Sequence, residues 1–170
     1  MSWIKRTQIV ALLLIATGEG VSIFAQKFFN PNSVIYEVST VAGVHFTQSG
    51  SDIKWVLSPG YHFSSSGFEL LLPIEAGVRL DNEAKKIDNA SFKMGYEIRY
   101  LFKNGKYRIG AGNRVSLYAD TYRELDNLIQ FTYRLSTGVR LGLELNYIIP
   151  FDHNHANIWC CSAVITTPLR

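Results

Sequence analysis

The chain has 170 residues, of which 47% are hydrophobic and 18% are charged, and its formal net charge at pH 7 is +3. This length fits one domain, and so apolar a composition excludes an intrinsically disordered chain. The small net charge, without a basic run that carries interleaved aromatic residues, argues against a nucleic-acid partner. The two cysteines are adjacent, which excludes the disulfide framework of small secreted domains.

The N-terminal residues have the pattern of a targeting segment. A Lys-Arg pair precedes a short apolar run at 9–16, and the candidate positions for cleavage are after Ala25 and after Gly18. This pattern is typical of a secretory signal peptide. The alternative is an N-terminal membrane helix, but the run is shorter than the ~20 residues that a span needs, and Glu19 interrupts it. The expected domains are a signal peptide at residues 1–25 and a β-barrel domain at residues 26–170.

Residues 128–149 show strict alternation of apolar and polar side chains. The odd positions from Ile129 to Ile149 are mostly apolar, and the even positions from Gln130 to Asn146 are mostly polar. A period of two predicts β-strands with one apolar and one polar face. In the middle, Gly138 supplies the positive φ that a three-residue hairpin loop needs at its end. The stretch therefore predicts two antiparallel strands.

Six further segments repeat this alternation, which gives eight strands in all, and no helical period of useful length follows residue 26. Pro59 lacks the N–H of a ladder residue, and Asn113 places a polar group on an otherwise apolar face. The six segments are approximately Val34–Thr47, Ile53–Phe63, Phe68–Leu80, Ser91–Phe102, Tyr107–Leu117 and Asn157–Thr167.

The connections between these segments alternate in character. Three are tight: Ser64–Gly67, Lys103–Lys106 and Ser136–Gly138, and Asn104-Gly105 favours a type I′ turn. The connections that would lie at the opposite end are mostly longer and polar. They are Gln48–Asp52, Asp81–Ala90, Ala119–Asn127 and Pro150–Ala156, of which Asp81–Ala90 is the longest.

Two closed barrels fit eight such strands: a soluble barrel with its apolar face inside, and a membrane barrel with its apolar face towards lipid. Aromatic residues near both strand ends, such as Trp55 and Tyr147, favour the membrane barrel. Glycines on the polar face, such as Gly110 and Gly112, also favour it, because the lumen of an eight-stranded barrel is just filled by side chains. Long basic side chains need small neighbours there.

The polar face carries charges of both signs, which can pair inside a lumen as buried charges must. We therefore predict a lumen charge network. Its expected members are Glu37, Lys54, Glu69, Glu75, Arg79, Lys93, Glu97, Arg99, Arg108, Arg114, Arg134, Arg140 and Glu144. A proton or ion path is the alternative role for this set.

In these features the chain resembles the small outer-membrane β-barrels of the OmpA/OmpX type. The resemblance implies an all-β, eight-stranded antiparallel up-and-down transmembrane β-barrel after a cleaved signal peptide. It also implies an outer-membrane location in a Gram-negative cell, with outer-membrane lipid and the barrel-assembly machinery as partners. The end of the chain, from Thr166 to Arg170, departs from the terminal aromatic residue that such barrels present to that machinery.

Few residues indicate reaction chemistry. Asp152, His153 and His155 could approach one metal ion, but a solvated polar loop explains them better, so we expect no metal and no cofactor. His45 and His62 lie on the polar face without a recognisable paired nucleophile. Some outer-membrane barrels are lipid hydrolases or acyltransferases, and a His with a Ser two residues on in a strand would signal one. His153-Asn154-His155 does not form such a pair, and we expect no enzyme.

The adjacent cysteines Cys160 and Cys161 point to opposite faces of their strand, and we interpret them as small apolar fillers. The leading functional expectation is a structural or surface-interaction protein that meets an extracellular partner through its longer loops. A small-solute pore is the first alternative. A secreted soluble barrel that binds an apolar ligand is the second.

Overall fold

The computed structural model describes residues 33–47, 49–63, 65–135 and 138–169. The predicted signal peptide and its cleavage sites lie outside the described residues. No helix in the described part of the chain is long and apolar enough to cross a membrane. Within 34–169, the residues that the structure describes form only β-strands, turns and bends as their regular structure.

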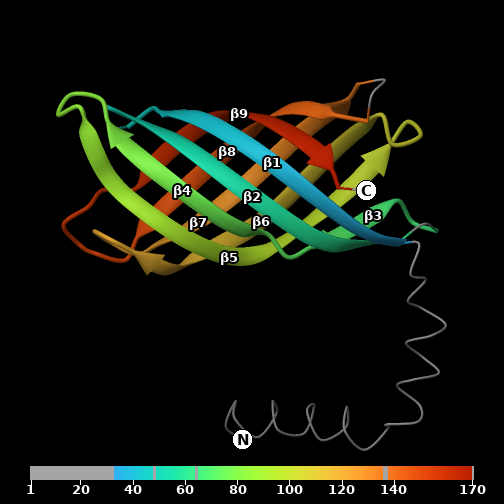
Figure 1. Cartoon of the computed structure of the whole chain (residues 1–170), viewed down its shortest axis with the longest axis horizontal. Helices are drawn as coiled ribbons and strands as arrows, with labels where there is room; N and C mark the ends of the chain where they lie inside the picture. Colours follow the sequence, from blue (N-terminus) through green and yellow to red (C-terminus); the bar gives the residue numbers. More distant parts are fainter. Residues whose placement is uncertain (1–32, 48, 64, 136–137, 170) are drawn as a thin grey trace, which may run out of the picture. The chain divides into compact units, whose positions relative to one another are not determined.

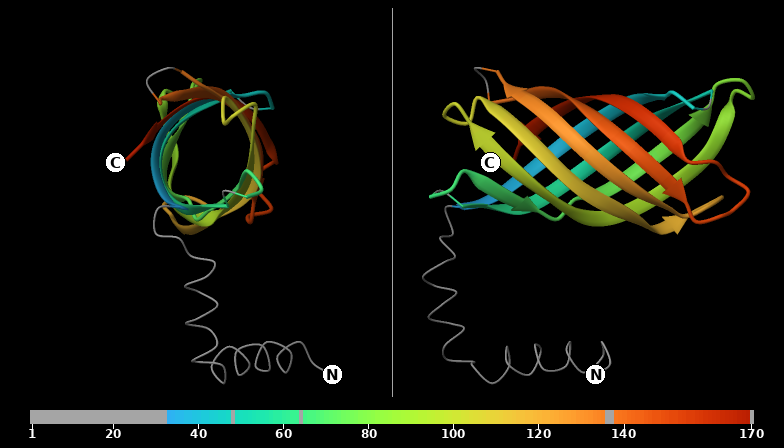
Figure 2. Two further views of the ribbon diagram at one scale, coloured as in Figure 1. Left: turned by 90° about the vertical axis from the view of Figure 1, so that its right-hand side faces the viewer. Right: turned by 180° about the vertical axis from the view of Figure 1, so that it is seen from behind.

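The strands form one antiparallel sheet that closes on itself (Figures 1 and 2). Consecutive strands pair along the chain, with β3 and β4 both placed between β2 and β5, and β1 pairs with both β2 and β9, which leaves the sheet without free edges. The strands are β1 (Val34–His45), β2 (Gly50–Phe63), β3 (Phe68–Leu71), β4 (Ile74–Asp81), β5 (Lys86–Phe102), β6 (Tyr107–Ala119), β7 (Glu124–Arg134), β8 (Arg140–Pro150) and β9 (Ile158–Pro168).

Strands β3 and β4 are two pieces of one strand. Gly60 pairs with Leu71 and Leu57 pairs with Ile74, so two residues separate these pairs on each side and the register continues unchanged. Pro73 lies in the break, and proline has no N–H to donate to a neighbouring strand. The molecule is therefore an eight-stranded up-and-down barrel, as the alternation in the sequence predicts.

The two faces of the sheet are those predicted. Large apolar side chains point outwards, among them Leu143 and Ile129, which remain 59% and 57% exposed. Charged side chains point inwards and are buried, such as Arg99 and Glu97. An apolar exterior around a charged interior suits a barrel surrounded by lipid and excludes the soluble barrel with an apolar lumen.

Aromatic side chains form a band on the outer surface at one end of the barrel. The ring centroids of Phe102 and Tyr107 lie 5.4 Å apart, and those of Tyr107 and Tyr133 lie 5.3 Å apart. Phe68 and Tyr100 continue this band at 5.0 Å. Such a band is typical of the boundary between lipid and water in membrane barrels.

The two ends of the barrel differ less than the sequence analysis predicts. The turn end contains connections 64–67, 103–106 and 135–139, and the loop end contains connections 46–49, 82–85, 120–123 and 151–157. The predicted long loops at Asp81–Ala90 and Ala119–Asn127 are wrong, because β5 already begins at Lys86 and β7 at Glu124. Only connection 151–157 is clearly longer than the turns at the turn end.

The Asn-Gly turn between β5 and β6 is confirmed. Its central residues Asn104 and Gly105 have φ values of 57° and 72°, as a type I′ turn requires. The amide N–H of Lys106 donates to the carbonyl oxygen of Lys103 across 3.2 Å, which closes the turn. Gly138, in the next hairpin, has the expected positive φ of 88°.

Candidate functional site

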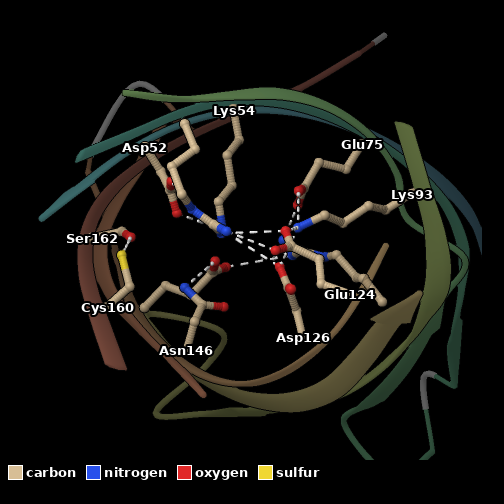
Figure 3. A network of polar contacts seen from close by, with 12 residues as sticks. Asp52, Lys54, Glu75, Lys93, Glu124, Asp126, Asn146, Cys160 and Ser162 are labelled. Atoms are coloured by element: carbon tan, nitrogen blue, oxygen red, sulfur yellow. Dashed lines mark hydrogen bonds and ion pairs between the residues drawn. The ribbon is translucent and has the colours of Figure 1, made fainter. Parts of the chain in front are cut away.

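The candidate site is the barrel lumen, which is filled by charged side chains. The structure buries twelve of the thirteen residues predicted for it, all except Arg134. They come from every strand of the barrel except β7 and β9. In Figure 3 the labelled Lys, Asp and Glu side chains point inwards from the surrounding strands, and most of them meet near the barrel axis. The buried twelve are Glu37, Lys54, Glu69, Glu75, Arg79, Lys93, Glu97, Arg99, Arg108, Arg114, Arg140 and Glu144.

At the turn end, two arginines share carboxylates from three strands. The Arg99 guanidinium donates to both oxygens of Glu97, through Nε at 2.5 Å and Nη2 at 2.9 Å. Its Nη1 donates to Glu37 at 2.5 Å. Arg108 donates to the other oxygen of Glu37 at 2.7 Å and to Glu69 at 3.3 Å. Bidentate pairs of this kind fix the positions of planar groups, so this part of the lumen is rigid.

Arg114 connects this cluster to the rest of the lumen. Its Nη1 donates to Glu75 at 2.7 Å, and its Nη2 lies 3.4 Å from Glu144 and 3.8 Å from Glu97. The amide groups of Gln130 and Asn146 also donate to Glu144, at 3.1 and 3.0 Å. Ion pairs and hydrogen bonds thus continue without a break from one end of the barrel towards the other.

At the loop end, lysines and carboxylates alternate around the lumen (Figure 3). Lys93 pairs with Glu124 and, at 2.8 Å, with Asp126. Arg79 holds Glu124 with two nitrogens, at 2.7 and 3.2 Å, and its Nε donates to Asp52 at 3.1 Å. A cavity that these residues help to line has a volume of about 10 Å³. That is the space of roughly one water molecule, too small for a solute.

Three lumen acids are absent from the predicted network: Asp52, Glu124 and Asp126, all buried. Their place in the sequence predicts connections instead, because polar residues at the end of a strand have the composition of a loop. A signal was present, however. Glu124 and Asp126 continue the even, polar positions of residues 130–146 in the same parity.

Arg134 is a correction to the predicted network. Parity places it on the polar face, but it is the last residue of β7 and is exposed at the barrel rim. Its Nη2 donates to the carbonyl oxygen of Asn104 in the neighbouring turn at 3.2 Å. At the last position of a strand, a long side chain on the inward face can extend past the barrel rim into solvent. Such a side chain stays exposed although its strand position faces the lumen.

Tyr122 covers the lumen at the loop end. Its side chain, from connection 120–123, is buried, and its hydroxyl accepts from Arg79 and donates to Asp88, both at 2.8 Å. Burial raises the pKa of the Tyr122 hydroxyl well above its ordinary value, which keeps the donor proton in place. His155 stacks on the ring with centroids 4.0 Å apart, so the long loop rests on this cap.

The histidines occupy different environments. His45 lies inside the barrel, with Nε2 at 3.0 Å from Oδ1 of Asp52, and His62 lies 3.7 Å from Glu69 at the other end. His155 is half-buried, with Nδ1 at 3.4 Å from Asp152 in the same loop. The expected fillers also differ from each other. Cys160 is fully buried in the lumen, and Cys161 is on the outward face.

Comparisons with known proteins agree with this architecture. The chain is similar to the outer membrane enzyme PagL (TM-score 0.57, 17% identity, 78% of this chain and 99% of that chain covered). It is also similar to a de novo designed transmembrane β-barrel (0.52, 15%, 79% and 95%). Neisserial surface protein A aligns with a TM-score of 0.48 and 18% identity, over 79% of this chain and 94% of that chain. No family and no curated protein matches the chain by sequence. The chain thus has the fold of small outer-membrane barrels.

Proposed function

We propose that this protein is an integral outer-membrane barrel that conducts no solute and has a structural or surface-interaction role. The observation that carries the proposal is the filled lumen. Ion-paired side chains occupy it from Glu69 near the turn end to Asp52 near the loop end, and Tyr122 covers the loop end. A bore that holds this many side chains at eight strands has no room for a permeating molecule.

The exterior supports the membrane part of the proposal. The outward faces of the strands present a continuous apolar surface with an aromatic band, which fits outer-membrane lipid as the surrounding partner. Connection 151–157 is the segment best suited to contact an extracellular partner, because it is the longest connection and holds the exposed Phe151. The short remaining connections limit such an interface to a small area.

Planar-bilayer recording of the purified monomer tests the closed lumen. We expect little or no steady conductance from the wild-type protein. Large, long-lived openings would instead support the second functional candidate, a small-solute pore, which rests on the polarity of the lumen.

The Tyr122→Ala variant tests whether the cap or the charge network closes the barrel. Removal of the ring opens the loop end but leaves the ion pairs of Arg99, Arg108 and Arg114 in place. We therefore expect this variant to remain silent in the same recordings. A steady current that appears only in Tyr122→Ala would mean that the lumen is a gated pore.

We propose no catalytic role for this chain. A lipid hydrolase in a barrel wall needs a nucleophile and a base that lipid can reach. His45 and His62 lie on the lumen side of their strands, and His153 and His155 lie in a loop. To test this proposal, the purified protein is incubated with outer-membrane lipid extract and the free fatty acids are analysed. Release of fatty acids that occurs only when the protein is present would contradict the proposal.

A further inference from the structure

We propose that His45, Asp52 and Cys160 form a binding site for a zinc-class divalent cation inside the loop end of the barrel. One ligand atom from each side chain lies within 4.8 Å of the other two. Nε2 of His45 is 3.0 Å from Oδ1 of Asp52. Small side-chain rotations bring such atoms to the 2.0–2.3 Å that zinc bonds require.

The barrel topology places these three residues together. Strands β9, β1 and β2 are consecutive in the sheet, and His45 on β1 pairs directly with Cys160 on β9. Asp52 on β2 pairs with Gly43, two residues before His45 on the same face. Figure 3 shows Asp52 and Cys160 on the same side of the lumen. Three rigid neighbouring strands therefore hold the ligands, rather than a loop.

The surroundings fit the three side chains closely. A Cβ atom at Gly50 would lie 2.5 Å from Nδ1 of His45, and one at Gly43 would lie 2.6 Å from Sγ of Cys160. A larger residue at either position would therefore force the imidazole or the thiol to move. Nε2 of His45 faces Oδ1 of Asp52 at 3.0 Å, and Oδ2 of Asp52 lies 3.7 Å from Nζ of Lys54, but neither Nε2 nor Oδ2 makes a hydrogen bond of good geometry to a described group, and both are buried. A buried polar atom without such a bond is unfavourable, and a cation would satisfy both.

The site has an entry from the loop end. A cavity of about 190 Å³ has His45 and Gly50 in its wall, together with one basic residue, Arg79, and three acidic residues of the β4–β5 hairpin, Asp81, Glu83 and Asp88. These carboxylates would attract cations and repel anions at the entrance. His45 forms part of the wall, so an ion in the cavity reaches the imidazole directly.

The ligand types select zinc rather than calcium or magnesium. Thiolate and imidazole suit zinc, whereas calcium and magnesium prefer oxygen ligands alone. On binding, the Cys160 thiol loses its proton to water and the thiolate sulfur bonds to the ion. The net change is one positive charge. The described lumen buries eight carboxylates and seven Lys or Arg side chains, so one positive charge balances it.

Arg79 and Lys54 lie close to Asp52 but are shared with other carboxylates. Arg79 holds Glu124 with two nitrogens, and Lys54 lies 3.6 Å from Asp126. These pairs reduce their repulsion of an ion. The alternative role for these three residues is catalysis, with Cys160 as a nucleophile that His45 activates. Cys160 is 0% exposed, however, and its Sγ contacts Oγ of Ser162 at 3.4 Å. A small ion can enter such a site, and a carbonyl substrate cannot.

Cobalt titration of the full-length, detergent-refolded protein tests the proposal. We expect a thiolate-to-cobalt charge-transfer absorption that saturates at one ion per chain and disappears when zinc is added. Cys160→Ser should abolish it, whereas Cys161→Ser should leave it unchanged, because Cys161 lies on the outward face. His45→Gln should weaken binding more than about tenfold, at least the loss expected for a group that supports a metal site. His62→Gln is its control.

Circular dichroism of each variant establishes that the barrel has folded. Asp52→Asn, which keeps the size of the side chain, provides a further variant if Cys160→Ser fails to fold, and it should also weaken cobalt binding more than about tenfold. The proposal is overturned if the wild-type protein shows no charge-transfer band. It is also overturned if the band survives in folded Cys160→Ser, or if folded His45→Gln and Asp52→Asn both bind as tightly as the wild type.

Discussion

Arg114 connects three carboxylates of the lumen. Its side chain is buried and contacts Glu75, Glu144 and Glu97, which belong to different parts of the network. Arg114→Met keeps most of the volume but leaves these carboxylates short of a cation. Breaking a buried pair from one side costs about 3–5 kcal/mol. We expect urea unfolding in detergent to show a loss of this size.

Arg134→Met is the matched control for this prediction. Arg134 lies on the same face by parity but is exposed at the rim, so its replacement should change the free energy of unfolding by less than about 0.5 kcal/mol. Equal effects of the two substitutions would contradict the lumen assignment of Arg114.

Gly112 shows how closely the strands of the barrel wall pack. A Cβ atom there would lie 2.2 Å from the carbonyl oxygen of Tyr96 and 2.8 Å from Cα of Glu97, both backbone atoms of β5. Gly112→Ala should therefore displace the strand pair and destabilise the barrel by about 1–3 kcal/mol. Thermal or urea unfolding in the same detergent measures this loss.

Gly77→Ala is the corresponding control. Its nearest contact would be Cγ of Lys54 at 3.2 Å, part of a flexible side chain that can move. We expect a clearly smaller effect than at Gly112. A barrel that tolerates Ala equally at both positions would show that β5 and β6 are less rigidly paired than described.

Alternation in the sequence predicts the direction of a side chain but not its partners. Parity placed Glu37 and Arg99 in the lumen, because successive strand residues point to opposite faces. Their pairing connects residues 62 positions apart, and only the barrel closure determines it. For the same reason, the alternation does not predict that the proposed metal ligands lie close together. His45 and Cys160 are neighbours only because the first and last strands pair.

At the scale of the elements, the β4–β5 hairpin is tighter than its sequence suggests. Polar residues from Asp81 to Ala90 look like a loop, yet Asp81 pairs with Lys86 and Leu80 with Ile87. Near a strand end both faces meet water or the charged lumen, so the apolar alternation disappears while the ladder continues. The alternation of apolar and polar residues therefore does not show where a strand ends once it extends beyond the lipid.

Lys85 in this hairpin has a φ of 51°, in the left-handed region that disfavours a side chain. Lys85→Gly relieves this conformation and should raise the free energy of unfolding by up to about 1 kcal/mol. Lys86→Gly, one residue later inside β5, should instead lower it by about 0.5–1 kcal/mol, because glycine weakens a strand. Urea midpoints of the two variants should move in opposite directions, and a shared direction would contradict the turn geometry.

At the scale of the whole molecule, an even number of strands places the start of the first strand and the end of the last strand at the same end of the barrel. Val34 begins β1 and Pro168 ends β9 at the turn end, opposite connection 151–157 (Figure 1). In outer-membrane barrels the short turns face the periplasm and the longer loops face outwards. We therefore expect connection 151–157 outside the cell and the turn at residues 103–106 inside.

Thiol labelling of intact cells tests this orientation. A membrane-impermeant maleimide should label Asn154→Cys on whole cells but label Lys106→Cys only after the outer membrane is permeabilised. The native cysteines should give a low background, because Cys160 is buried in the lumen and Cys161 points outwards within β9, where lipid surrounds it. The unsubstituted protein measures that background. Labelling of Lys106→Cys on intact cells, with Asn154→Cys protected, would mean that the barrel is inserted the other way round. Labelling of both variants only after complete lysis would place the protein away from the outer membrane.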